Sequence, residues 1–208
     1  WQVAYANTTL IRSKHATREK RVKMMDSILM PCLLYGGETW MWTAELLGQV
    51  LTAERQFYRW CMRIQAPPNV DGGQAATTLA AWIVWQSATA RDLASYTATA
   101  QRTRWTHCAM NRLWAWAGQV TRLDPRNDTR MSSNSDAKER GRGRLAPTWS
   151  TPMQRFSAHE LGGNNDIWQD IAANPKSWDA LKTTFTNFVH LHIMTAQARD
   201  SLRRDEQA

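Results

Sequence analysis

Apolar residues recur at helical spacing along most of this chain, and no segment shows the alternation that is typical of β-strands. The pattern predicts a first helix from Thr17, its N-cap, to about Met30. Pro31 is expected to end or kink this helix. A second helix is predicted from Thr43, again as N-cap, to about Ile64.

The second helix has the clearest pattern. Its apolar residues lie within one arc, and three arginines spaced by four lie on the opposite side. The apolar residues are Leu46, Leu47, Val50, Phe57, Cys61 and Ile64, and the arginines are Arg55, Arg59 and Arg63. Three guanidinium groups on one face can grip consecutive phosphates. An ordinary solvated face explains the same pattern, and the sequence leaves both interpretations open.

A third tryptophan-rich helix is predicted from about Gln101 to Thr121. Trp105 and Trp116 share its apolar face with several aliphatic residues, whereas Trp114 is expected to project from the other side. Gly118 weakens such a helix by ~1 kcal/mol relative to alanine unless close packing compensates.

The remaining segments complete a mainly α fold, an irregular helical array with long basic loops and room for a few short strands. Helix is expected over 74–101, near Asp166–Ala172 and from about Pro175 onward. A Pro- and Gly-rich linker begins at residue 66, and a basic loop occupies 124–147. The predicted organisation is therefore a thumb-like helical segment 1–65, a helical segment with a basic loop 66–147, and a C-terminal helical segment 148–208.

Composition points to an anionic partner. The net charge is +8, and residues 1–150 carry 20 basic and 11 acidic side chains, whereas 151–208 carry 6 and 7. Many basic proteins bind no polyanion, so charge alone is a weak signal.

Three widely spaced cysteines favour a reducing, intracellular location, nuclear or cytoplasmic. No apolar run is long enough to span a bilayer, so no membrane partner is expected.

No motif predicts a catalytic residue, a metal ligand or a cofactor. Nucleotidyl transfer needs paired carboxylates that hold two metal ions, and the sequence has no Asp-Asp pair. No Cys-x-x-Cys pair suggests zinc, and no glycine-rich phosphate loop or nucleophile elbow is present. His192 falls on the apolar side of its helix, where a core histidine is the usual explanation.

Basic segments with interleaved aromatic residues favour contact with a nucleic-acid backbone over base reading. The region of Arg102, Arg104 and Trp105 repeats this mixture, as does the basic loop that precedes Trp149. The residues predicted to bind RNA or DNA are Lys20, Lys23, Arg55, Arg59, Arg63, Arg112, Arg140, Arg142 and Arg144.

Three motifs in the same order resemble the region that follows the polymerase palm in non-LTR (LINE-type) retrotransposon reverse transcriptases. The first is Met-Pro-Cys-Leu-Leu-Tyr-Gly-Gly-Glu-Thr-Trp, ending at Trp40. The second is Arg-Leu-Trp-Ala-Trp-Ala-Gly-Gln-Val-Thr-Arg-Leu, starting at Arg112. The third is the Arg-Gly-Arg-Gly-Arg run ending at Arg144, followed by Trp149. Gln119 stands where that family usually has histidine.

The resemblance implies that residues 1–65 belong to the thumb, which holds the primer–template duplex, and that the rest contacts RNA or DNA. The palm and fingers of the parent RNA-directed DNA polymerase would lie upstream, so this chain alone would not be an enzyme. A start at Trp1 rather than Met fits a fragment or an incomplete gene model. The alternatives are a helical protein-interaction or scaffold module, with tryptophans as core and interface anchors, and a decayed retroelement copy without function. An independent hydrolase or nuclease has the least support.

Overall fold

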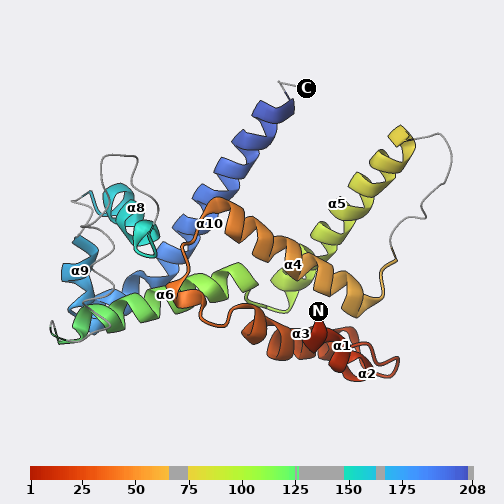
Figure 1. The fold of residues 1–208 in the computed structure, drawn as a ribbon, viewed down its shortest axis with the longest axis horizontal. Helices are drawn as coiled ribbons and strands as arrows, with labels where there is room; N and C mark the ends of the chain where they lie inside the picture. Colours follow the sequence, from red (N-terminus) through yellow and green to blue (C-terminus); the bar gives the residue numbers. More distant parts are fainter. Residues whose placement is uncertain (66–74, 125, 127–147, 163–166, 206–208) are drawn as a thin grey trace. The chain divides into compact units, whose positions relative to one another are not determined.

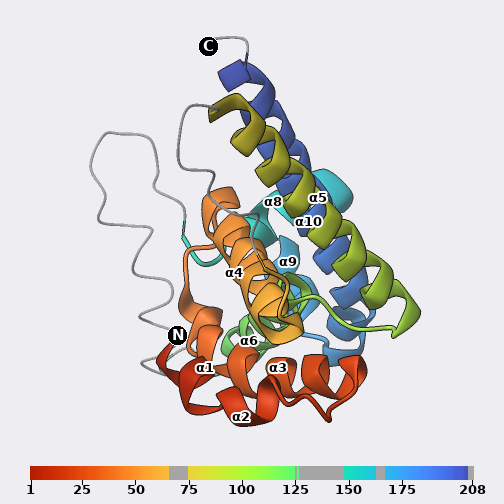
Figure 2. The ribbon, with the colours of Figure 1, turned by 90° about the vertical axis from the view of Figure 1, so that its right-hand side faces the viewer.

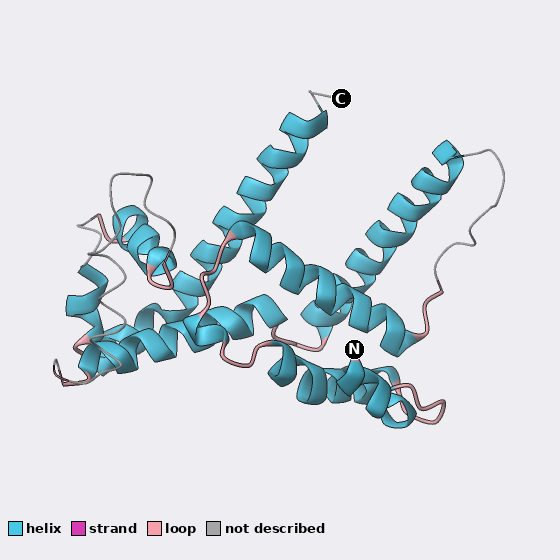
Figure 3. Cartoon of the chain, viewed as in Figure 1, coloured by secondary structure: helices cyan, strands magenta, loops and turns pink. Residues whose placement is uncertain are grey.

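The computed structural model describes residues 1–65, 75–124, 126, 148–162 and 167–205. Every regular element in these ranges is helical and none is a strand, which confirms the predicted mainly α fold (Figure 3). The helices, in chain order, are α1 (Gln2–Ala6), α2 (Thr8–Ile11), α3 (Arg18–Leu33), the 3-10 turn η1 (Gly37–Thr39), α4 (Ala44–Met62), α5 (Ala75–Thr99), α6 (Trp105–Arg122), α8 (Thr151–Glu160), α9 (Ile167–Ala172) and α10 (Pro175–Asp205) (Figure 1). Over the described residues, no helix is both long and apolar enough to cross a membrane.

Local hydrogen bonds start the first two long helices where the sequence predicts. Thr17 Oγ1 accepts a hydrogen bond from the backbone N–H of Lys20 at 3.3 Å, and Thr43 Oγ1 accepts one from Leu46 at 3.2 Å. Pro31 does not end α3, which continues to Leu33. A proline in the last turn removes one N–H hydrogen bond and leaves few turns beyond it to disrupt. Helix α8 has no counterpart among the predicted helices.

The chain divides into two compact units. Unit 1 comprises Trp1–Tyr35 and Gln49–Trp105, and unit 2 comprises Gly36–Gly48 and Thr106–Ala208. Each unit is therefore assembled from two separate stretches of sequence. The predicted segments 1–65, 66–147 and 148–208 divide the chain at other positions, and that organisation stays a prediction.

In unit 1, α3 packs against α1 and α2, which lie beside it in both views of the ribbon (Figures 1 and 2). Val22, Met25 and Leu29 are buried on α3, as the helical spacing predicts. On α4, the apolar arc supplies Val50 and Cys61 to the interior. The short helices α1 and α2 contribute Ala4 and Ile11 to this core.

A buried ion network fixes the segment between α5 and α6 within unit 1. Arg102 forms two 2.6 Å hydrogen bonds to the carboxylate of Asp26, and its Nη1 lies 2.8 Å from Glu54 Oε1. Arg104 binds the other oxygen of Glu54 at 2.8 Å. The Trp105 indole N–H donates to Asp26 at 2.7 Å. The carboxylates that hold Arg102 raise its pKa despite burial, so this guanidinium is a structural cation rather than a surface contact.

In unit 2, α10 packs against α8 and α9, and its interior centres on stacked tryptophans. The Trp114 and Trp178 rings lie 3.5 Å apart and 2° from parallel. Each indole N–H donates to the other residue's carbonyl, at 3.0 and 2.9 Å. The expectation that Trp114 projects away from the core is therefore wrong, since it is 1% exposed. Helix α6 is buried on two sides. The side that carries Trp114, which the apolar pattern of α6 does not predict to be buried, contacts Phe156 of α8 and Phe185 of α10.

Gly118 permits that tryptophan stack. A Cβ built on Gly118 would lie 2.4 Å from Trp178 Nε1 and 2.7 Å from its Cδ1. Carbon atoms at van der Waals contact are about 3.5–4.0 Å apart. The indole therefore occupies the space that any other residue would need, and close packing compensates for glycine's low helix propensity.

Candidate nucleic-acid interface

Arg55 and Arg59 lie one turn apart on α4, in unit 1, and both are half-buried rather than fully solvated. Burial lowers the pKa of Arg55, and the Arg104 cation lowers it further, against a smaller opposing effect of Glu54. Burial also lowers the pKa of Arg59, and Arg55 adds to this decrease. Arg55, Arg59 and Arg104 therefore form a group of like charges, called here the α4 arginine cluster.

The cluster carries an excess of positive charge. Arg104 is paired with Glu54, but that carboxylate is shared with Arg102. Within the described part of the chain, the side chains of Arg55 and Arg59 form no ion pair. Guanidinium groups stay protonated in proteins, so their mutual repulsion and incomplete solvation are relieved when an anion binds. The arrangement is suited to binding phosphates, and it contains no group placed for acid–base or nucleophilic chemistry.

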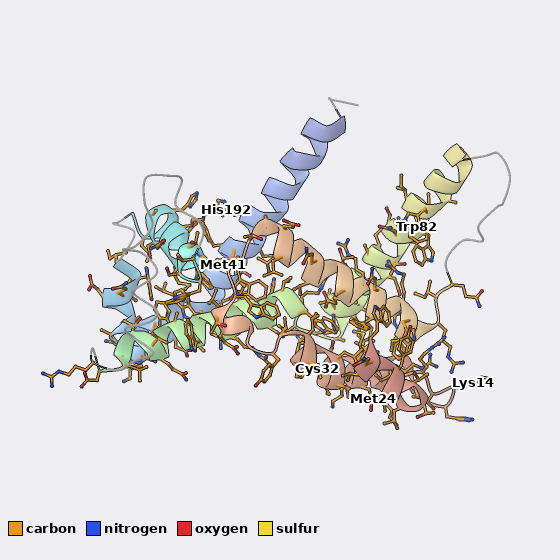
Figure 4. The ribbon with its side chains drawn as sticks, viewed as in Figure 1. Lys14, Met24, Cys32, Met41, Trp82 and His192 are labelled. Atoms are coloured by element: carbon orange, nitrogen blue, oxygen red, sulfur yellow. The ribbon has the colours of Figure 1, made fainter. Side chains whose placement is uncertain are left out.

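Tryptophans from α5 lie beside this cluster. The Arg59 guanidinium sits 4.3 Å from the ring centroid of Trp85, in cation–π contact. The Trp85 ring is 4.8 Å from that of Trp82, one turn earlier on α5. Trp82 is 42% exposed and is labelled on α5 in Figure 4. An exposed indole next to arginines offers a surface on which a base can stack.

The third arginine of the predicted stripe lies apart from the other two. Arg63 follows the end of α4 and has a left-handed φ of 57°. Its guanidinium donates a hydrogen bond to the Arg12 carbonyl. The Arg12 guanidinium in turn lies 5.6 Å from the Trp60 ring centroid. The end of the helix redirects the Arg63 side chain, so the three arginines do not form one straight row.

The other predicted binding residues fall in three places. Lys20 and Lys23 are exposed on α3 in unit 1. Arg112 belongs to α6 in unit 2 and is half-buried. Arg140, Arg142 and Arg144 lie outside the described residues, so their predicted role stays a prediction.

Several aromatic and basic side chains that the sequence associated with nucleic acid are core residues. Trp105 is fully buried, and Trp149 is 9% exposed with its ring 4.6 Å from that of Trp116. Neither ring offers a free face for a base. His192, expected in the core, is exposed, with its ring 4.1 Å from Phe188. The last buried apolar residue before it on α10 is Val189, about one turn earlier, so His192 lies beyond the covered part of the helix.

Sequence reasoning missed Trp82, Trp85 and the role of Arg104. The i, i+3 spacing of the two tryptophans was a usable signal, because it places both rings on one face of a helix. Nothing in the sequence could have signalled that Arg104 lies near Arg55, since Arg55 is on α4 and Arg104 lies in the segment between α5 and α6, 49 positions later. Among the residues that the structure describes, no group of three or more His, Cys, Asp or Glu side chains could hold a metal ion.

No family model, curated protein or solved structure matches this chain.

Proposed function

We propose that this chain binds the sugar–phosphate backbone of RNA or DNA through the α4 arginine cluster. The observation that carries the proposal is the pair Arg55 and Arg59, two half-buried, adjacent cations that form no ion pair with a described carboxylate. Phosphate oxygens supply the missing counter-charge and accept hydrogen bonds from guanidinium groups. The basic balance of residues 1–150 supports the same partner. The proposed role is binding, without catalysis.

Single strands are the better partner for this surface. Trp82 presents a partly exposed indole beside Trp85, which lies under the Arg59 guanidinium. Stacking of a base on such a ring contributes about 1–3 kcal/mol, and duplex bases are already stacked on each other. The cluster therefore binds phosphates while Trp82 takes a base, with little preference for sequence.

The first test measures binding to a fluorescent oligonucleotide as a function of salt. Affinity should fall steeply between low and moderate salt, because phosphate contacts release counterions. The double variant Arg55→Ala/Arg59→Ala should weaken binding and lower the steepness of the salt dependence by about 1–2 in log–log slope. The matched control is Lys14→Ala/Arg91→Ala, which removes the same charge from two exposed positions in unit 1; Lys14 is labelled in Figure 4.

Two results would contradict the proposal. If the affinity of the unsubstituted chain for the oligonucleotide does not change with salt, a phosphate-driven mechanism is excluded. An equal loss of binding in the two double variants would show that net charge, rather than the α4 arginine cluster, governs the interaction. Circular dichroism of each variant confirms that folding is preserved.

The second test addresses the strand preference. Trp82→Ala should weaken binding of a single strand by about 5–100-fold, the equivalent of one base stack, and change duplex binding little. The control is Ile83→Ala, which removes a neighbouring apolar side chain that is 54% exposed. Equal effects of the two substitutions would mean that Trp82 does not stack on a base.

The parent of this chain is proposed to be a non-LTR retrotransposon reverse transcriptase, on the strength of the three ordered motifs. In that protein the palm and fingers carry the polymerase chemistry, and this region holds nucleic acid. The genomic reading frame upstream of Trp1 tests the parentage directly. Codons for a Tyr-x-Asp-Asp hairpin there would support it, and a frame that encodes an unrelated domain would refute it.

One observation favours a different function, a helical protein-interaction module. Ile83 and Val84 on α5 are 54% and 64% exposed, next to Trp82. Exposed apolar side chains in a row are typical of surfaces that contact another protein. A stable oligomer or complex in light scattering, together with no shift of a nucleic-acid probe, would support this alternative over backbone binding.

A further inference from the structure

An open cleft in unit 2 combines cationic side chains with a rigid floor. It encloses about 430 Å³ between the second half of α6 and the first turns of α10. This volume lies within the range of small-molecule sites, about 300–1,000 Å³. The cleft belongs to unit 2 alone, so it is independent of the α4 arginine cluster in unit 1.

The floor of the cleft is preformed. It is made by Trp114 and Trp178, whose stacked rings are locked by two reciprocal hydrogen bonds. Gly118 lets the two helices approach closely enough for this stack. A floor that does not rearrange lets a ligand bind without the cost of ordering these side chains.

Among the described residues, the walls carry three cations and one carboxylate. Arg122, Lys176 and Lys182 line the cleft together with Asp179. Arg122 is oriented by a 2.8 Å hydrogen bond from its Nη1 to the Ala172 carbonyl, which leaves its other donors available. Over the described residues, none of the three cations lies within ion-pair distance of a carboxylate. The cleft therefore has an excess of positive charge that its own walls do not neutralise.

The N-terminus of α10 adds to the positive electrostatic potential of the cleft, although two of its first backbone N–H groups are already hydrogen-bonded. Asn174 Oδ1 already accepts hydrogen bonds from the backbone N–H groups of Lys176 and Ser177, at 3.0 and 3.4 Å. The positive end of the helix dipole still favours an anion near this turn. The side chains, rather than the backbone, must then make the direct contacts, and an anion with several acceptor oxygens suits three separate donors.

We propose that the cleft between α6 and α10 is a second anion site, which binds a phosphate group through Arg122, Lys176 and Lys182. The phosphate is carried on a nucleotide or nucleic-acid strand, or is free. This site goes beyond the backbone binding proposed for unit 1 and does not depend on it. Chloride is a poorer ligand, because it lacks the separate oxygen acceptors that three donors can share.

The test is calorimetric titration of the 208-residue chain carrying Arg55→Ala/Arg59→Ala, so that the α4 arginine cluster does not contribute. The probes are adenosine 5′-monophosphate, inorganic phosphate, adenosine, and a trinucleotide that has internal phosphodiesters and no terminal phosphate. Adenosine monophosphate should bind and adenosine should not. Comparable binding of inorganic phosphate identifies the free anion as sufficient, and tighter binding of the trinucleotide identifies a strand as the source.

The variant Lys176→Ala/Lys182→Ala should weaken phosphate binding about tenfold or more, since hydrogen bonds to charged groups are lost. The matched control is Arg126→Ala/Arg155→Ala, which removes two exposed cations in unit 2 that do not line the cleft and should change nothing. Asp179→Asn removes the one carboxylate among the described lining residues and should tighten binding roughly two- to fivefold. This exposed position also keeps the proposal testable if the double lysine variant does not fold.

Failure of all three phosphate-bearing probes to bind at millimolar concentration would overturn the proposal. So would binding that the lysine and Asp179 substitutions leave unchanged. Either result leaves the unit 1 proposal intact, because the titrated protein already lacks the side chains of Arg55 and Arg59. Conversely, if the Arg55→Ala/Arg59→Ala protein no longer binds a long strand, we still expect it to bind adenosine monophosphate at this cleft.

Discussion

Substituting Gly118 with alanine separates two physical effects that have opposite signs. Alanine is the better helix former, so at an open site the change would stabilise α6 by about 1 kcal/mol. At Gly118, however, the new methyl group would lie 2.4 Å from Trp178 Nε1, 2.7 Å from its Cδ1 and 3.1 Å from Arg122 Nη1. The first two distances overlap a buried ring by about 1 Å relative to ordinary contact, so Trp178 must move.

The cost follows from what Trp178 would lose. Overpacking a core typically costs about 1–3 kcal/mol. Leaving a buried indole N–H or its carbonyl partner unsatisfied costs about 1–3 kcal/mol, and loss of the stack with Trp114 costs about 0.5–1.5 kcal/mol. These contributions overlap, because one ring shift causes all of them. After the helix-propensity gain is subtracted, we expect Gly118→Ala to lower the free energy of unfolding by about 2–5 kcal/mol.

Urea denaturation, followed by near-ultraviolet circular dichroism, measures this loss and reports the stacked indoles directly. The control is Ala115→Gly on the exposed side of the same helix, which should cost about 1 kcal/mol through propensity alone. Propensity predicts opposite signs for the two substitutions, whereas packing predicts that both destabilise. If the Gly118→Ala protein is as stable as the unsubstituted chain and has the same near-ultraviolet spectrum, the packing argument is refuted.

Three further predictions concern buried groups in unit 1. Replacing Arg102 with alanine should cost about 3–5 kcal/mol in urea denaturation, because Glu54 is left buried with less compensation; a loss below about 1 kcal/mol would contradict this. Burial raises the pKa of the Cys61 thiol to about 12. At pH 8 a thiol reagent should therefore label the exposed Cys32, which is labelled in Figure 4, long before Cys61, as measured by peptide mass spectrometry. Equal labelling rates would contradict the burial of Cys61. Because the pKa of Cys61 is raised in the folded state, its contribution to the free energy of unfolding is complete below about pH 9 and is lost as the pH rises toward 12. Burial also raises the pKa of the Tyr58 hydroxyl, so Tyr58→Phe should make the loss of stability above about pH 10 shallower.

Much of the secondary structure could be predicted from the sequence, because its signals act over a few residues. Thr17 and Thr43 accept hydrogen bonds from N–H groups three positions on, so the start of each helix is encoded next to the residues that form it. Apolar spacing likewise identified the buried residues Val22, Met25 and Leu29. Helix α8 is only 10 residues long, and the sequence pattern predicts no helix at its position.

The candidate binding residues could be predicted only in part. The four-residue spacing of Arg55 and Arg59 correctly placed them on one side of a helix. It could not show that both are half-buried, that Arg104 lies near them, or that Arg59 covers Trp85. The same kind of residue, Arg102, proved to be part of a buried ion network. Charge is visible in a sequence, but the environment of the charge is not.

Sequence alone determined the helical class, the starts of α3 and α4 and the uneven distribution of charge, because each depends on neighbouring residues or on composition. Tertiary structure decided which faces meet. Trp114 was assigned to solvent by the periodicity of its own helix, yet Trp178, 64 positions away, stacks on it and exchanges hydrogen bonds with it. A helix specifies the direction of its side chains within a few residues, whereas burial depends on a partner that folding brings from elsewhere in the chain.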